Sequence, residues 1–425
     1  MSAADLLFVN AAQVVTCAGA ARARRGSEMR DADIRRGAAV AVHAGVVLAV
    51  DAQEGLEHRY PDAARVDCAG GVLTPGLVDS HTHAIFGRAR YEEQELRATG
   101  VPYMEIARRG GGIHASVRDL RSRGDDELVE LARRRLVRMA SYGTTTVEVK
   151  SGYGLTVADE LRMLRVIARL ERELPLRLIP TWLGAHEIPV EFRATPAARE
   201  AYIAMLIDDM LPIIARDGLA RFADVFCEPG VFTLDETRRI LMAARAAGLA
   251  LKLHADELES SGAAQLAAEL GATSADHLAA ISEPGIRALA LSDTVATLLP
   301  GTMLFLGKGR QAPARALLDA GAAIALASDF NPGTSPTVNL PLILTLGVSE
   351  LHLSVAECVL AATVNGAAAL GLAQRVGQIA PGFAADLALF DIEDVRELPY
   401  WYGDRRCMGS WVSGKPCHPY DLPVS

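Results

Sequence analysis

The chain has 425 residues, of which 50% are hydrophobic and 22% are charged, and its formal net charge is −9. This composition is ordinary for a soluble protein, and the length predicts roughly two to three domains, or one barrel with an appendage. The acidic balance argues against nucleic acid or an anionic membrane as the main partner. A basic pocket within the acidic protein stays compatible with these numbers, and Arg88 and Arg90 are candidates for it.

The cysteines and the N-terminus indicate a cellular compartment. Six cysteines lie far apart and form no Cys-x-x-Cys pair, a pattern typical of reduced thiols. The opening residues, MSAADLLFVNAAQ, lack a basic segment followed by a long apolar one, so we expect no signal peptide. No apolar run approaches the roughly eighteen residues of a membrane span. The sequence therefore predicts a cytoplasmic protein.

The two ends of the chain have the same kind of sequence pattern. Residues 1–73 and residues 372–425 contain short β-branched stretches separated by glycine-rich turns, which predict strands. Neither end is long enough to bury a good core alone. We therefore expect both ends to combine into one small β-sandwich domain.

The middle of the chain, residues 74–371, alternates eight short apolar runs with helical patterns. Expected helices include Thr156–Leu174, Leu234–Gly248 and Ser354–Gly371, where the N-terminal capping residues and C-terminal glycines mark the ends. Eight strands alternating with helices predict a parallel (β/α)8 barrel of the TIM type. An open, doubly wound sheet is the structural alternative.

His81-Thr82-His83 follows the first of these runs. Side chains alternate along a strand, so both imidazoles would face the same side and could bind one metal ion. Such barrels carry their active sites at the C-terminal ends of the strands. Further candidates at expected strand ends are Glu148, Lys150, His186, His254, Glu257, His277 and Asp329.

Each candidate also has a plain structural explanation. A lone histidine is usually a satisfied core or surface residue. Asp329, in SDFNPG, could form an Asx-turn, and Glu257 could be a carboxylate at a helix start. Tyr153 could pack over a glycine turn, and the run Arg133–Arg135 is expected to be a solvated helix face.

Longer motifs carry a resemblance to a known family. PGLVDSHTH, LHADE, ADHL, ASDFNPG and GQIAPGFAADLALF are similar to the amidohydrolase superfamily of metal-dependent hydrolases, over essentially the whole chain. More closely, DSHTHAIFGRARYEE, KSGYGL, TWLGAHEIP, KLHADE and SDFNPGT resemble the imidazolonepropionases of histidine degradation.

This resemblance implies a cofactor and a reaction. One Zn²⁺ or Fe³⁺ ion, with Fe²⁺ as a further option, would be held by His81, His83, His254 and Asp329. Three imidazoles and a carboxylate suit these metals and leave room for water. The implied substrates are 4-imidazolone-5-propionate and water, and the implied product is N-formimino-L-glutamate.

Roles for individual residues follow as expectations. Asp329 would also accept the proton of the attacking water, while Glu257 and His277 would act as acid–base or carbonyl-polarising groups. Arg90 offers a planar, bidentate donor for the propionate carboxylate. The remaining expected substrate contacts are Tyr103, Tyr153, His186, Glu257, Asn331, Gly333 and Thr334.

Several alternatives stay open at this point. Lys150 is similar to the carbamylated lysine of some relatives, but we place it on the wrong strand for that role. A second metal at Glu228 is a further option. The same ligands would serve a heterocycle deaminase, and a non-catalytic scaffold is a rival from another class. We expect a homodimer, the common default, while the native metal and the order of proton transfers are left open.

Overall fold

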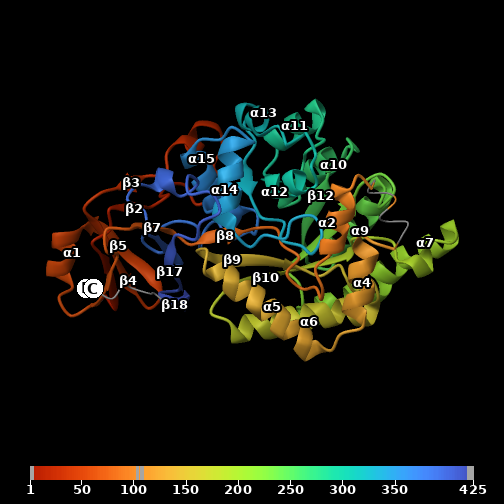
Figure 1. Cartoon of the computed structure of the whole chain (residues 1–425), viewed down its shortest axis with the longest axis horizontal. Helices are drawn as coiled ribbons and strands as arrows, with labels where there is room; N and C mark the ends of the chain where they lie inside the picture. Colours follow the sequence, from red (N-terminus) through yellow and green to blue (C-terminus); the bar gives the residue numbers. More distant parts are fainter. Residues whose placement is uncertain (1–3, 102–104, 106–109, 419–425) are drawn as a thin grey trace.

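The computed structural model describes residues 4–101, 105 and 110–418. Figure 1 shows a small β-structure beside a larger assembly of strands and helices. The red N-terminal and blue C-terminal segments lie together in the small part. Within the described residues, no helix is long and apolar enough to cross a membrane.

The largest sheet has eight parallel strands, which neighbour each other in the order of the sequence. Nearly all their residues are buried, as expected for parallel strands that are covered on both faces. They are β8 (Leu77–Asp79), β9 (Thr144–Lys150), β10 (Arg177–Ala185), β11 (Phe222–Cys227), β12 (Ala250–Ala255), β13 (Ser274–His277), β14 (Val295–Leu298) and β15 (Ile324–Leu326).

The first and last strands meet just beyond their C-terminal ends. Thr82 forms an isolated parallel bridge with Phe330, and the backbone N–H of His83 donates to the Phe330 carbonyl at 2.8 Å. Asp79 accepts hydrogen bonds from the backbone N–H and the hydroxyl of Ser328, at 3.0 and 2.5 Å. The predicted (β/α)8 barrel is therefore confirmed, and the sheet is not an open, doubly wound one. We call this junction the seam of the barrel.

Helices cover the outside of this barrel, as Figure 1 shows. Between β8 and β9 along the chain, the described elements include α2 (Tyr91–Ala98), α4 (Ile113–Arg121) and α5 (Asp125–Ala140). The others are α6 (Val157–Glu173), α7 (Pro196–Ala204), α8 (Leu211–Asp217), α9 (Leu234–Ala246), α10 (Ala263–Glu269), α11 (Glu283–Ala290), α12 (Pro300–Phe305), α13 (Ala314–Asp319), α14 (Leu340–Ser349), α15 (Val355–Ala361) and α16 (Val364–Ala368). Short 3-10 and π turns add Val190–Phe192 and Met205–Met210.

Two smaller sheets form the β-structure at the other end of the molecule. One contains β1 (Leu6–Val9), β4 (Ala38–His43), β5 (Val46–Ala52) and β6 (Ala64–Asp67), with α1 (Gln53–Arg59) after β5. The other contains β2 (Gln13–Val15), β3 (Ile34–Arg35), β7 (Val72–Pro75), β16 (Leu387–Phe390), β17 (Cys407–Val412) and β18 (Lys415–His418). The 3-10 turns Gly26–Arg30 and Val395–Glu397 complete the described elements.

Strands from both chain ends share the second sheet, because β7 pairs with β2 and with β16. The two sheets pack against each other, with the Phe8 and Trp411 rings edge-to-face at 5.0 Å. The expected small domain built from both ends is therefore present. The expected domain boundaries, 1–73, 74–371 and 372–425, stay predictions, and β7 extends across the first of them.

Two of the expected helices agree with the structure, and one does not. Thr156 caps α6 by accepting from the Asp159 backbone N–H, and α9 ends just before Gly248, which has φ +91°. The continuous helix expected over 354–371 is wrong, because the chain breaks between α15 and α16 at Thr363. There the Thr363 hydroxyl donates to the Val359 carbonyl, and Asn365 donates to the Ile324 carbonyl of β15.

One buried ion pair joins the small domain to the base of the barrel. The carboxylate of Asp386 accepts from the Arg177 guanidinium at 3.0–3.2 Å and from the Ser413 backbone N–H at 2.8 Å. The Asp386 side chain is 1% exposed and that of Arg177 is 14% exposed. The pair therefore lies away from water.

Asp386→Ala should lower the free energy of unfolding by about 3 kcal/mol, because it leaves a largely buried guanidinium without its partner. Urea unfolding followed by circular dichroism measures this. Asp217→Ala, which removes an exposed ion pair with Arg216, is the matched control and should leave the transition unchanged. Equal effects of the two substitutions would contradict the interpretation.

Candidate metal centre and active site

The expected site residues lie at the C-terminal ends of the barrel strands. His81 and His83 follow β8, His186 follows β10, His254 lies in β12, and His277 ends β13. Asp329 lies three residues beyond β15. The structure thus brings residues from distant parts of the sequence to one end of the barrel, and all are at most 6% exposed.

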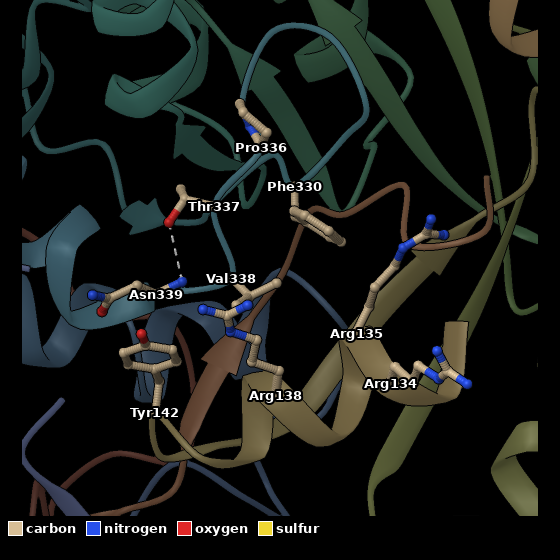
Figure 2. Close-up of a pocket in the computed structure, with 9 residues that line it drawn as sticks. All are labelled: Arg134, Arg135, Arg138, Tyr142, Phe330, Pro336, Thr337, Val338 and Asn339. Carbon is tan, nitrogen blue, oxygen red and sulfur yellow. Dashed lines mark hydrogen bonds between the residues drawn. The ribbon is translucent and has the colours of Figure 1, made fainter. Parts of the chain in front are cut away.

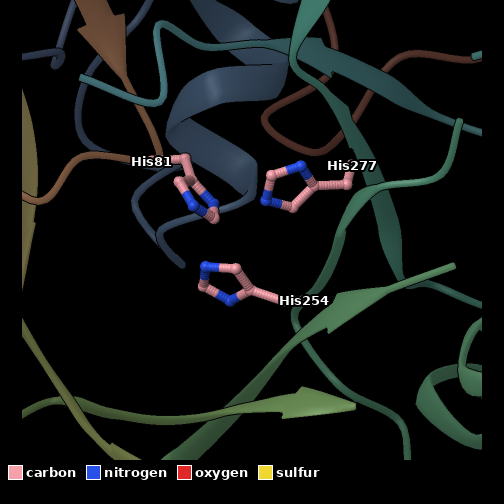
Figure 3. Close-up of side chains that lie close together, drawn as sticks. All are labelled: His81, His254 and His277. Atoms are coloured by element: carbon pink, nitrogen blue, oxygen red, sulfur yellow. The ribbon is translucent and has the colours of Figure 1, made fainter. Parts of the chain in front are cut away.

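Four imidazole rings surround a common point. The ring centroids of His81 and His254 are 4.5 Å apart, and those of His254 and His277 are 5.1 Å apart. His83 lies 5.4 Å from His81 by the same measure. Figure 3 shows the rings of His81, His254 and His277 turned toward each other.

Carboxylates behind the rings fix the orientation of two histidines. The Nδ1 atom of His81 lies 2.6 Å from Asp276, and that of His254 lies 3.0 Å from Asp224. In a neutral His81 ring, Nδ1 then carries the proton and Nε2 has a free lone pair. Among the described residues, the buried Nε2 atoms of both rings have no hydrogen-bond partner, and Nδ1 of His254 meets Asp224 at an ion-pair distance without a hydrogen bond. A metal ion could accept the lone pairs of these two Nε2 atoms.

The protonation of these rings also suits metal binding. Burial, reinforced by nearby Lys150, holds the pKa of His81 well below its ordinary value. Burial and nearby His186 do the same to the pKa of His83. Both rings are therefore neutral near pH 7, the form that binds a metal.

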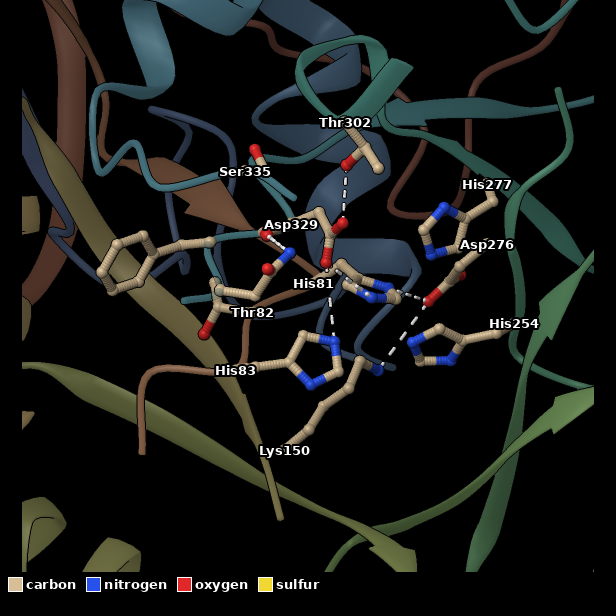
Figure 4. Close-up of polar contacts among 12 residues, drawn as sticks. His81, Thr82, His83, Lys150, His254, Asp276, His277, Thr302, Asp329 and Ser335 are labelled. Atoms are coloured by element: carbon tan, nitrogen blue, oxygen red, sulfur yellow. Dashed lines mark hydrogen bonds and ion pairs between the residues drawn. The ribbon is translucent and has the colours of Figure 1, made fainter. Parts of the chain in front are cut away.

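Two fully buried lysines balance the carboxylates behind the rings. The ammonium of Lys150 lies 2.8 Å from both Glu148 and Asp224, and that of Lys252 lies 3.3 Å from Glu148 and 3.6 Å from Asp276. Burial opposes the charge on Lys150, but Asp224 and Glu148 still raise its pKa above the ordinary value. Lys150 thus serves as the counter-charge for these acids. Figure 4 shows its contact with Asp276 behind the His81 ring.

Asp329 faces the same point from the other side of the barrel. Its Oδ1 lies 3.5 Å from Nε2 of His81 and of His83, and its Oδ2 accepts from the Thr302 hydroxyl at 2.6 Å (Figure 4). The Asx-turn considered for Asp329 is instead made by Asn331, whose Oδ1 accepts from the backbone N–H groups of Gly333 and Thr334. The carboxylate of Asp329 is therefore directed at the histidines.

Strained backbone occurs at two of these positions. Asp329 has φ +50° and His277 has φ +80°, values that non-glycine residues seldom adopt. Such strain persists only where surrounding structure enforces it, and it concentrates at functional sites. The positive φ values of Asp329 and His277 therefore support a functional role for these two side chains.

The donor atoms fit a zinc or iron ion. Nitrogen or oxygen atoms of His81, His83 and Asp329 lie within 4.8 Å of one another, as do those of His81, His254 and His277. Three neutral imidazoles with one carboxylate are ligands that both metals accept. Two groups of possible ligands therefore share His81, and His277 is a further potential ligand that the sequence did not suggest.

Glu257 lies beside His277, with Oε2 3.6 Å from its Nδ1. Burial, and then the charge of Asp329, raise the pKa of Glu257 to about 8. Glu257 lies six residues before α10, which begins at Ala263. The alternative role of a helix-start carboxylate is instead filled by Asp256, which accepts from the Gly262 and Ala264 backbone N–H groups.

Glu228 has a structural role. Its carboxylate accepts from the backbone N–H groups of Glu257, Leu258 and Glu259, at 2.6–3.1 Å. Among the described residues, it belongs to none of the groups that could hold a metal ion. The structure therefore gives no support to a second metal there, and Glu228 positions the loop that carries Glu257.

Arg90 lies in the wall formed by the loops after β8 and β15. Its side chain is 9% exposed, its Nη1 donates to the Ser116 hydroxyl at 2.8 Å, and its backbone N–H donates to the Pro332 carbonyl. A Cβ on Gly333 would lie 1.7 Å from Arg90 Nη2, so only glycine leaves room for the guanidinium. Asn331 and Thr334 complete this wall.

Two further expected contacts lie against the histidines. The rings of His186 and His83 stack at 5.1 Å, and Tyr153 lies 5.3 Å from His186. His186 Nδ1 contacts the Gly152 carbonyl at 2.9 Å, which fixes its ring. Tyr103 lies outside the described residues.

Two cavities lie near this region. One, of about 330 Å³, is lined by Arg90, Glu93, Ser116 and neighbouring residues. The other, of about 320 Å³, lies outside the barrel between α5 and the loop at 336–339 (Figure 2). Arg135 lines this second cavity. The expectation that Arg133–Arg135 form a solvated helix face is wrong for Arg135, because its side chain donates to the Ala84, Phe86 and Gly87 carbonyls in the loop after His83.

Sequence analysis missed the residues that support the site. Asp224, Lys252, Asp276 and Thr302 were not singled out, although the first three are charged residues inside apolar strand runs. A charge within a buried parallel strand needs a partner. That signal could have found Asp224, Lys252 and Asp276.

Comparisons with known proteins agree with this geometry. An amidohydrolase family model matches residues 72–416. The chain is 46% identical to the imidazolonepropionase of Symbiobacterium thermophilum over 95% of both chains. It is 44% identical to that of Geobacillus kaustophilus, over 93% of this chain and 94% of the relative.

Solved structures share the fold at low identity. An adenosine deaminase from Xanthomonas campestris with bound zinc gives a TM-score of 0.73 at 22% identity, covering 99% of this chain and 95% of that one. An atrazine chlorohydrolase from Arthrobacter aurescens complexed with zinc gives 0.70 at 18% identity, covering 99% and 96%. The family model and the relatives that are 44–46% identical show that the chain belongs to the amidohydrolase family and, within it, to the imidazolonepropionase group.

Proposed function

We propose that this protein is a metal-dependent hydrolase that opens the ring of 4-imidazolone-5-propionate in histidine degradation. The observation that carries the proposal is the buried pair of unpartnered Nε2 atoms, on His81 and His254, beside Asp329. The substrate is inferred from relatives that carry the name imidazolonepropionase at 46% and 44% identity. The product is N-formimino-L-glutamate.

The metal is proposed to be one Zn²⁺ or Fe³⁺ ion, with Fe²⁺ also compatible, held by His81, His83, His254 and Asp329. An ion of this kind supplies Lewis acidity that polarises a carbonyl and makes water a competent nucleophile near neutral pH. Asp276 and Asp224 keep the His81 and His254 rings turned toward the centre.

The reaction breaks the bond between the ring carbonyl carbon and its ring nitrogen. Water oxygen adds to this carbon, one water proton leaves, and the departing nitrogen gains a proton. We propose that Asp329 accepts the water proton through Oδ1, which is supported by the hydrogen bond of Thr302 to its Oδ2. We propose that Glu257 and His277, which lie 3.6 Å apart, protonate the nitrogen and donate to the carbonyl oxygen.

Arg90 is proposed to bind the propionate carboxylate, with Tyr153 and His186 against the ring and Asn331, Gly333 and Thr334 beside the carboxylates of the product. A guanidinium binds a carboxylate through two parallel hydrogen bonds. Tyr103 remains a proposed contact. A homodimer and a cytoplasmic location also remain predictions.

Removing a ligand histidine should remove the metal. His81→Ala or His254→Ala should lose bound metal and nearly all turnover, because each deletes a donor that points at the centre. Metal content by mass spectrometry and a turnover assay on freshly generated imidazolonepropionate measure this. His58→Ala, on the exposed face of α1, is the control, and full metal retention in either ligand variant would make that assignment wrong.

Substitutions of Glu257 and His277 should lower the rate of the reaction without loss of the metal. Glu257→Gln or His277→Ala should keep the metal but lower kcat by about a hundredfold, since each removes a proton donor or a carbonyl contact. The same two assays apply. Loss of metal in the His277 variant would instead identify His277 as a ligand, which its position near His81 and His254 allows.

Substitution of Arg90, the proposed binding residue for the propionate tail and here called the tail anchor, tests the identity of the substrate. Arg90→Ala should lower kcat/KM for imidazolonepropionate at least about tenfold without changing metal content, because a charge-assisted bond is lost. Arg90→Lys should recover only part of the loss, since lysine lacks the planar fork. For an analogue without the propionate carboxylate, kcat/KM should differ little between the wild type and the Arg90 variants. Equal losses for both compounds would contradict the anchor and favour a heterocycle deaminase.

A further inference from the structure

Glu93 lies between the proposed tail anchor and the start of the next helix. Its Oε2 lies 3.3 Å from Nε of Arg90, and its Oε1 accepts from the backbone N–H of Gly112 at 2.7 Å. Glu93 is on α2, and Gly112 is the residue that precedes α4. One carboxylate therefore joins the guanidinium to the N-terminal end of α4.

The pair differs from an ordinary ion pair on a helix surface. The side chains of Arg90 and Glu93 are both 9% exposed. At the start of the same helix, Arg88, which precedes α2, and Glu92 form a second pair with 54% and 50% exposed side chains. Exposed pairs contribute little, whereas a buried charge needs its partner. The Arg90–Glu93 pair is thus the one with a structural consequence.

Three groups together confine the Arg90 guanidinium. The Glu93 carboxylate lies 3.3 Å from Nε as an ion-pair partner, without a hydrogen bond to Nε, and Ser116 on α4 accepts from Nη1 at 2.8 Å. On a third side, the backbone of Gly333 approaches so closely that a Cβ there would overlap Nη2. The guanidinium plane is therefore set before any ligand arrives.

The backbone at Gly112 is shaped for its contact with Glu93. Gly112 has φ +70° and ψ −155°, a conformation that is essentially restricted to glycine. This conformation presents its N–H to the Glu93 carboxylate. Glu93 also lies at the end of α4 where a negative charge is favourable. The contact therefore ties the orientation of Arg90 to the position of α4.

We propose that Glu93 is a positioning residue for the carboxylate-binding guanidinium of Arg90. It supplies the counter-charge on the Nε side of the guanidinium, so that Nη2 and the second hydrogen of Nη1 are left for a monoanionic substrate tail. Through Gly112, it also ties the orientation of this side chain to the position of α4. Because the guanidinium is ordered in advance, less conformational freedom is lost when the tail binds. This inference rests on the proposed function, and it adds a residue that would not itself touch the substrate.

Glu93→Gln tests the proposal. An amide that accepts from Gly112 through its oxygen presents its NH₂ group to Arg90 Nε–H, so two donors face each other. We expect KM for imidazolonepropionate to rise about tenfold, because a largely buried guanidinium loses its counter-charge. We expect kcat to change by less than about twofold and metal content to stay constant, because uniform binding alone is affected.

A double-mutant cycle and a binding assay give readouts that a general structural role would not produce. In an Arg90→Ala background, Glu93→Gln should have no further effect on KM. Calorimetry with imidazole-4-propionate, a non-hydrolysable ligand with the same tail, should give a parallel rise in Kd, whereas 4-propylimidazole should bind both proteins equally. Glu92→Gln, on the exposed neighbouring pair, is the matched control and should resemble the wild type.

The outcomes separate this proposal from the function on which it rests. A wild-type protein without activity on imidazolonepropionate overturns the proposed function and this inference with it. An active wild type with an unchanged Glu93→Gln variant, or an equal loss in the Arg90→Ala background, overturns the role of Glu93 alone. If Glu93→Gln does not fold, Ser116→Ala replaces it, and the expected result is a smaller rise in KM at constant kcat.

Discussion

Charge balance inside the barrel is the constraint on which the rest of the site depends. Lys150, Lys252, Glu148, Asp224 and Asp276 are all 0–1% exposed. An isolated charge at such a position would cost several kcal/mol, so these residues are stable only as a set. Two of the acids, Asp224 and Asp276, also hold the His254 and His81 rings. The orientation of the His81 and His254 rings therefore depends on the same acids that keep the buried charges paired.

This arrangement separates two kinds of acid by their surroundings. Asp224 faces Lys150 and His254, which hold its pKa well below the ordinary range despite burial. At Glu257, burial and then the nearby charge of Asp329 outweigh the opposing charge of Lys308 and raise the pKa to about 8. The two carboxylates therefore hold a proton with different affinity. This difference follows from their neighbours, not from the residue type.

Much of the fold could be predicted from the sequence, because period and order are local properties. The apolar runs predicted the strands, and His81 and His83 could be placed together because strand side chains alternate. The break at Thr363 could not be predicted, since it depends on contacts of Asn365 with β15. Arg135 looked like any surface arginine, and only the folded loop after His83 gives it three carbonyl acceptors. The role of Glu93 could not be predicted for the same reason, because its partner Gly112 lies just before another helix, α4.

The seam of the barrel brings recognition and chemistry together. The loop after β8 carries His83 and then Arg90, while the loop after β15 carries Asp329 and then Gly333. These loops are joined at two points, by the His83 N–H to the Phe330 carbonyl and by the Arg90 N–H to the Pro332 carbonyl, each at 2.8 Å. Backbone hydrogen bonds therefore hold the loop that carries His83 and Arg90 against the loop that carries Asp329 and Gly333. A shift of one loop against the other would move the proposed metal ligands and the proposed tail anchor together.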